Sequence, residues 1–163
     1  MEIKRIDEAT LRISGLDPIL CNLLQQIVPS ADPTGSEAAQ ARLFSPPIAE
    51  PGEEEFIADW KDYVVPELRQ LFQSALEVIQ RDVAGCRETI FGKAVLDLPV
   101  SHLESWIHGI NQARLALAAR HAFTEEEMDR IIPLAGDARS FALVQVRFYG
   151  ILEELFLREL EGE

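Results

Sequence analysis

The sequence predicts a mainly α fold, a bundle of about five helices with a short N-terminal β-hairpin. Two segments, 101–122 and 138–160, repeat apolar residues at intervals of three and four, which is typical of helices that face a core. The chain has 163 residues, of which 47% are hydrophobic and 26% charged, so its composition is that of a folded globular protein. We therefore expect a single domain over 1–163, with these two helices at its centre.

The first fifteen residues predict the hairpin. Apolar residues flank a polar Asp-Glu-Ala-Thr turn on both sides, as in two short paired strands. An isolated hairpin is marginally stable, so this one must pack on the helices. A helix over 16–28 follows, because Asp17 suits its N-cap, Pro18 suits its first position and Pro29 ends it.

Residues 29–52 hold five of the nine prolines and predict a long irregular strap. Ser36 is expected to cap one or two helical turns inside it, which end near Arg42. Three apolar side chains are expected to pack the strap on the domain: Leu43, Phe44 and Ile48.

A helical pattern covers residues 53–84. Its apolar stripe is expected to face the core and consists of Phe56, Trp60, Tyr63, Leu71 and Val78. Pro66 lies inside the pattern, so we expect a kink or two helices that meet at Val65. Residues 85–100 show no clear pattern and end at Pro99.

Capping boxes mark two further helices. Ser101 with Glu104 predicts the start of helix 101–122, and Thr124 with Glu127 predicts a short helix over 124–132. The final helix, 138–160, has apolar residues on two sides, and its second strip consists of Leu143, Val146, Gly150 and Leu157. A helix that is apolar on two sides is either central in its bundle or shared with a partner chain. A C-terminal helix is often peripheral, so we expect a homodimer with this strip in a two-fold interface.

Arg114 is the least expected residue on the inner face of helix 101–122, where it shares the apolar stripe with His121. A guanidinium keeps its proton, so on a core face it needs a carboxylate, carbonyl groups or a bound anion. Two interpretations stay open. In the first, Arg114 is structural and pairs with an acid or with carbonyls of the strap, the candidate acids being Glu67, Asp59 and Asp62. In the second, an anion pocket is lined by Arg114, Asn111, His121 and His108.

The formal net charge of −13 disfavours contact with nucleic acid. Residues 16–68 hold ten acids against Arg42 and Lys61, a net −8. This region is either a set of solvated helix faces or an acidic docking surface for a basic partner protein. No apolar run is long enough to span a bilayer and no signal peptide is recognisable, so we expect a cytoplasmic protein without membrane contact.

No established motif for a metal, a cofactor or nucleophilic catalysis is present. The histidines lack Glu-x-x-His and His-Glu-x-x-His spacing, and there is no P-loop, G-x-G-x-x-G or G-x-S-x-G sequence. Cys21 and Cys86 match no metal-ligand spacing, and Cys21 is expected to be an ordinary buried thiol. We therefore expect no metal site, no cofactor and no catalytic residue.

The segment 106–117, WIHGINQARLAL, resembles the signature W-x-x-x-[IL]-N-x-x-R-L-x-L of an uncharacterised bacterial family of small helical proteins, a domain of unknown function. Further similar elements are Asp32–Pro33, Arg42–Leu43–Phe44 and Glu55–Phe56. Actinobacterial members are typically encoded beside ClpS, the adaptor of the Clp protease. The resemblance implies a bacterial cytosolic protein with a link to regulated proteolysis, and it assigns no catalytic residue because the family has no established activity.

We therefore expect a non-enzymatic adaptor or regulatory protein that acts by protein–protein contact. The alternative is a small-anion-binding protein or an enzyme that uses a pocket around Arg114. A carboxylate partner for Arg114 with no cavity beside it would remove the support for this alternative.

Overall fold

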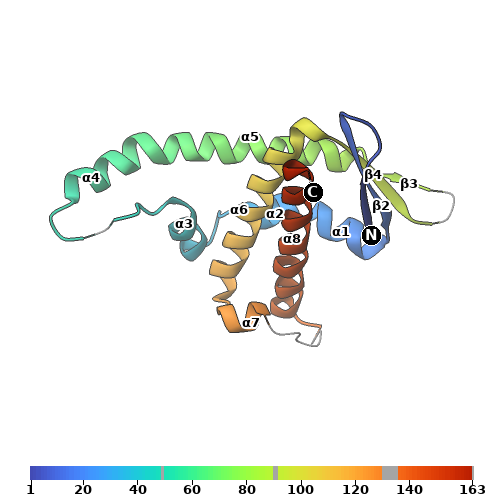
Figure 1. Ribbon diagram of the computed structural model, residues 1–163. Helices are drawn as coiled ribbons and strands as arrows, with labels where there is room; N and C mark the ends of the chain where they lie inside the picture. The colour runs from blue at the N-terminus through green and yellow to red at the C-terminus, as the bar shows by residue number, and fades with distance from the viewer. Residues whose placement is uncertain (49, 90–91, 130–135, 163) are drawn as a thin grey trace.

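The computed structural model describes residues 1–48, 50–89, 92–129 and 136–162. It is mostly helical (67%) and begins with a β-hairpin, which confirms the mainly α class and the N-terminal hairpin. One long helix, α5 (Val65–Ala84), has a small sheet at one end, while α6 (Leu103–His121) and α8 (Ala138–Glu161) run side by side across it (Figure 1). No helix in the described ranges is long and apolar enough to cross a membrane.

The sheet has four antiparallel strands in the order β1-β2-β4-β3. Their bounds are Glu2–Arg5 for β1, Thr10–Leu16 for β2, Arg87–Glu88 for β3 and Ala94–Pro99 for β4. The predicted hairpin is therefore half of a larger sheet, whose other two strands, β3 and β4, come from the segment for which no clear pattern was predicted. Leu96 and Leu98 of β4 alternate with exposed or half-buried residues and face the core with Leu11 and Ile13 of β2.

The segment after the hairpin differs from the expected helix 16–28, because it forms two short helices and continues past Pro29. α1 (Pro18–Gln25) is capped by Asp17, whose carboxylate accepts the N–H of Leu20 at 2.8 Å. A second helix, α2 (Ile27–Ala31), follows at once and contains Pro29. Pro29 does not end this segment because the first turn of a helix needs no N–H donor.

The predicted strap contains a regular helix, α3 (Glu37–Phe44), capped by Ser36. Phe44 packs as expected, with its ring 5.9 Å from the ring of Phe72. Ile48 is exposed, so it does not hold the strap on the domain.

Pro66 produces a π-helical segment, not a simple kink. α4 (Glu54–Asp59) continues into η1 (Trp60–Val64), and α5 starts at Val65. The N–H of Val65 bonds to the carbonyl of Trp60, five residues earlier. The proline ring removes a donor and crowds the preceding turn, so the chain widens there and α5 begins with Pro66 in its first turn.

The predicted core stripe of residues 53–84 is wrong, because none of its five residues is buried and even Val78 is only half-buried. Tyr63 is 70% exposed and Leu71 is 52% exposed, whereas Ala75, Leu76 and Ile79 are buried. The reason is position, because α4, η1 and the start of α5 extend past the body of the molecule (Figure 1). Only the later turns of α5 lie over α6.

Of the two predicted capping boxes, the one at Thr124 is present and the one at Ser101 is not. Thr124 and Glu127 exchange side chain–backbone bonds at 3.0 and 3.2 Å and open α7 (Glu125–Asp129). The predicted end of that helix, 130–132, lies outside the described residues. Ser101 instead sits in a 3-10 turn, η2 (Val100–His102), and no side chain caps α6.

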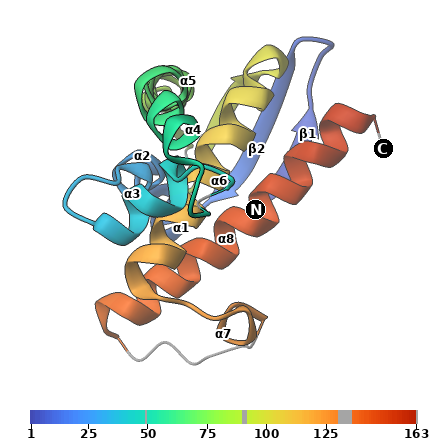
Figure 2. The same ribbon diagram turned by 90° about the vertical axis from the view of Figure 1, so that its left-hand side faces the viewer.

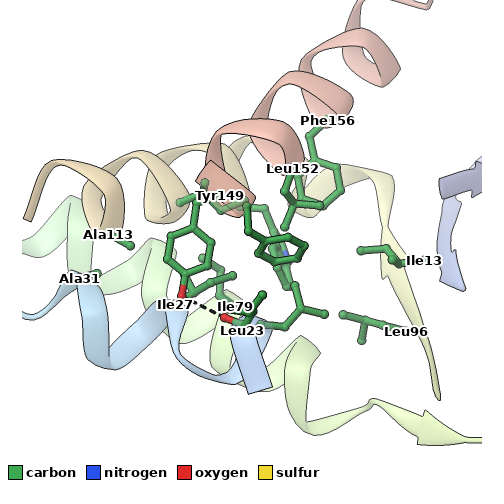
Figure 3. Packing of buried hydrophobic residues seen from close by; sticks show 14 of the residues in the cluster. Ile13, Leu23, Ile27, Ala31, Ile79, Leu96, Ala113, Tyr149, Leu152 and Phe156 are labelled. Atoms are coloured by element: carbon green, nitrogen blue, oxygen red, sulfur yellow. Dashed lines mark hydrogen bonds between the residues drawn. The ribbon is translucent and has the colours of Figure 1, made fainter. Parts of the chain in front are cut away.

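α6 is the centre of the fold and contacts α2, α3, α5 and α8. Trp106 is fully buried, meets Phe156 of α8 edge to face and donates its indole N–H to Asp82 at 2.8 Å. In Figure 3, Tyr149 of α8 points to α1, and its hydroxyl donates to the carbonyl of Leu23 at 2.9 Å. Burial raises the pKa of Tyr149 to about 12, so this hydroxyl keeps its proton.

The predicted dimer strip on α8 needs correction. Leu143 and Val146 are only 4% and 3% exposed within one chain, while Leu157 is exposed. α8 lies against α6 over most of its length and also contacts α7, and its last turns reach β1 (Figure 2). α8 is therefore a central helix, and two of the four strip residues belong to the monomer's own core.

Candidate functional site

Arg114 pairs with Glu153 of α8, and not with Glu67, Asp59 or Asp62. The Arg114 side chain is 35% exposed and that of Glu153 is 16% exposed, so the ion pair lies at the edge of the α6–α8 contact. Arg114 thus has a carboxylate partner, as the structural interpretation expects, but the partner comes from a different helix than the predicted acids. Glu67 is exposed on α5, and Asp59 and Asp62 are exposed on α4 and η1.

Gly150 gives the Arg114 guanidinium its place on α8. A β-carbon built on Gly150 would lie 3.5 Å from the guanidinium carbon and from two of its nitrogens. The close approach that predicted a second chain is thus used by Arg114 of the same chain. The Nε atom of Arg114 is buried and has no hydrogen-bond partner among the described residues.

Arg114 separates two cavities. The larger, about 650 Å³, is lined by charges of both signs, including Arg147, Glu125 and Glu154. The smaller, about 390 Å³, is here called the Arg42–Arg114 groove and is lined by Arg42, Asn111, Arg114, Leu115, Ala118, Ala119, Ala122, Phe123, Met128 and Val146. None of these lining residues is acidic, so the groove combines two guanidinium groups with apolar walls.

The residues predicted around Arg114 do not all meet there. Asn111 lines the groove, but His121 and His108 line neither cavity beside Arg114. His121 is half-buried and stacks on Phe123, with ring centroids 5.4 Å apart. Burial, and then the nearby charges of Arg120 and Arg139, lower the pKa of His121, which makes it a poor cationic ligand for an anion near neutral pH.

A second candidate surface is the projecting helical segment, here called the acidic arm (residues 53–67). It holds six acids against Lys61, a net −5, and its acidic side chains are all exposed: Glu53, Glu54, Glu55, Asp59, Asp62 and Glu67. The arm is held from one side, since Trp60 donates to the carbonyl of Phe44 at 2.9 Å and Arg69, just beyond the arm, covers the Phe44 ring at 4.3 Å. Its other sides face solvent (Figure 1).

The model of the family described as "Domain of unknown function (DUF2017)" matches residues 7–160. The chain belongs to this family. Searches of the curated proteins and of the solved structures gave no significant match. The family match therefore covers nearly all of the described chain without supplying an activity.

The residues of the family-like signature in segment 106–117 lie partly in the core and partly at the surface. Trp106, Ile110 and Leu117 are buried core residues, whereas Asn111, Arg114 and Leu115 line the Arg42–Arg114 groove. Half of the signature is thus explained by packing alone, and the other half gathers at one groove.

Two contributors to this site were missed in the sequence, Glu153 and Arg42. Glu153 follows Gly150 by three residues, so both lie on one face of α8, and this spacing is the signal that could have linked them to Arg114. Arg42 is one of two basic residues in the acidic region 16–68, a weak signal that becomes informative only once α3 is placed against α6. No group of three or more His, Cys, Asp or Glu in the described ranges is arranged to hold a metal ion.

Proposed function

We propose that this protein is a non-enzymatic adaptor or regulatory protein and that the acidic arm binds a basic surface of a partner protein. The observation that carries the proposal is the joint exposure of acids and large apolar side chains on one projecting helix. Tyr63, Phe56 and Leu71 are all exposed on or next to the arm.

Exposed apolar and acidic residues contribute differently to binding. Aromatic side chains supply most of the affinity at protein interfaces once they are desolvated. A cluster of like charges raises the association rate with an oppositely charged partner and selects against acidic ones. Solvated helix faces, the alternative interpretation of the acidic region, account for the charges but do not require Tyr63 to be 70% exposed.

Affinity capture with matched charge variants tests the proposal. The arm variant carries Glu55→Lys, Asp59→Lys and Asp62→Lys, and the control carries Glu8→Lys, Glu88→Lys and Glu161→Lys. All six positions are exposed, so the two variants change the net charge equally. Wild type and control should retain the same partner, in a salt-sensitive manner, and the arm variant should lose it.

A second variant, Tyr63→Ala, separates the apolar from the electrostatic contribution. It should weaken capture without changing its salt dependence. Retention of the same partner by both the arm variant and Tyr63→Ala would show that the arm is not the binding surface.

The link to regulated proteolysis comes from the family resemblance and is part of this proposal. Purified ClpS is the defined probe, titrated against wild type and the arm variant by calorimetry. Binding to wild type that the arm variant loses would support the link. If ClpS does not bind while another partner is captured through the arm, the link is removed and the arm proposal is retained.

The Arg42–Arg114 groove supports a second function, binding of a small anion with an apolar part. Arg114 is already paired with Glu153, so Arg42 provides the remaining positive charge at the groove. Octanoate is a suitable probe, because its chain matches the apolar wall and its carboxylate matches a guanidinium. A melting shift that Arg42→Ala removes and Arg81→Ala retains would support this function, and an equal shift in both would exclude the groove as the site.

A further inference from the structure

Cys21 and Cys86 are 65 positions apart in sequence, but the fold brings them to one cavity. Cys21 lies on α1, and Cys86 follows the last turn of α5, where its N–H bonds to the carbonyl of Val83 at 3.1 Å. α1 packs on both α5 and β2. A cavity of about 350 Å³ is lined by both cysteines together with Leu16, Ala94 and Glu88.

Both thiols are half-buried against the hydrophobic core and are free. Burial is the largest cause that raises the pKa of the Cys21 thiol, and the neighbouring Cys86 raises it further. The two thiols therefore lie at one cavity, and the Cys21 thiol ionises less readily than an ordinary exposed thiol.

We propose that Cys21 and Cys86 form a dithiol–disulfide redox site that a small-molecule disulfide such as oxidised glutathione converts to an intramolecular crosslink between α1 and the α5–β3 junction. This differs from the expectation for the sequence, in which Cys21 is an ordinary buried thiol. The site lies at the end of α5 remote from α4 (Figure 1), so the proposal is independent of the acidic arm.

The chemistry needs two exchange steps. The Cys86 thiolate attacks one sulfur of glutathione disulfide, and one glutathione thiolate leaves. The Cys21 sulfur, after losing its proton to solvent, then attacks the Cys86 sulfur and expels the second glutathione thiolate. Two protein thiols are oxidised and one glutathione disulfide is reduced to two glutathione molecules. The second step is favoured because the two sulfurs are held together.

Intact mass and peptide mapping after treatment with oxidised glutathione and alkylation test the site. The chain has only two cysteines, so the products are unambiguous. Wild type should lose two hydrogen atoms, take up no alkylating agent and give a peptide that joins Cys21 to Cys86. The oxidised form should melt higher by roughly 5–10 °C, because the crosslink restricts the unfolded chain over a long loop.

Single serine variants show the order of attack. Cys21→Ser should accumulate a stable glutathione adduct at Cys86, whereas Cys86→Ser should form an adduct at Cys21 more slowly. Glutathione adducts on both thiols of the wild type, unreacted thiols or disulfide-linked dimers would each overturn the proposal. Circular dichroism of both variants confirms that these products come from folded protein.

Discussion

The acidic arm and the α6–α8 pair both carry large apolar residues at helical spacing, and they use them in opposite ways. On the α6–α8 pair, Trp106, Tyr149 and Phe156 are fully buried and contact one another or neighbouring helices. On the arm, Tyr63 and Phe56 are exposed, and acids surround them. The same periodicity therefore marks a core in one region and a candidate binding surface in the other.

The α6–α8 pair and the acidic arm differ in whether other elements of the chain cover their apolar faces. α6 has helices on several sides and the sheet near its start, so its stripe is covered within the chain. The arm contacts α3 through Trp60 and Phe44, and this contact leaves Tyr63 and Phe56 exposed. An uncovered stripe keeps its apolar area available for another protein.

The largest expected effect is the contrast between Trp106→Ala and Tyr63→Ala. Trp106→Ala leaves a cavity against Phe156 and removes the indole donor to Asp82. The free energy of unfolding should therefore fall by about 3–5 kcal/mol. Tyr63→Ala should change stability by less than about 0.5 kcal/mol because the side chain is exposed. Urea unfolding measures both, and a large loss in Tyr63→Ala would mean that the arm is part of the core.

Next in size is the loss of the Arg114–Glu153 ion pair at the edge of the central helices. Arg114→Met leaves Glu153 poorly solvated without its partner, and the cost should be about 1–3 kcal/mol because the pair is partly exposed. The double variant Arg114→Met, Glu153→Leu should recover most of that loss. A double-mutant cycle with no recovery would show that Arg114 acts through packing on Gly150 and not through the carboxylate.

The sequence was sufficient for what depends on local chemistry and insufficient for what depends on which helices meet. The Asp17 cap, the Thr124–Glu127 box and the disturbance at Pro66 were predictable because each is settled within one turn. Glu153 was not predictable as the partner of Arg114, because 39 residues separate them and only the α6–α8 packing joins them. β4 was missed although its alternation is regular and Gly92 precedes it, since an apolar run as short as Ala94–Pro99 does not by itself distinguish a strand from a helical segment.

A smaller, paired prediction concerns two helical glycines that look alike in sequence. A β-carbon on Gly109 of α6 would lie 2.3 Å from the δ-carbon of the buried Ile79, so Gly109→Ala should cost about 1–3 kcal/mol through overpacking. At Gly150 of α8 the nearest atoms, at 3.5 Å, belong to the Arg114 guanidinium, so Gly150→Ala should be neutral or stabilising by up to about 1 kcal/mol. Melting temperatures that rise in both variants would show that helix propensity, and not packing, decides both positions.

The smallest expected effect is a pH dependence that separates the end of α6 from the arm. The pKa of His121 is lowered in the folded state by burial and by the charges of Arg120 and Arg139. The unfolded chain therefore binds the proton more readily, and stability should fall as the pH drops below the ordinary histidine pKa of about 6.5. His121→Gln removes this contribution, so its stability should change less than that of wild type between about pH 7.5 and 5.

The pH window stays above the carboxyl range, because Asp97, Glu127 and Asp137 have lowered pKa values and their protonation destabilises the fold only on further acidification. Equal pH slopes for wild type and His121→Gln would show that the half-buried stacking on Phe123 does not penalise the imidazolium.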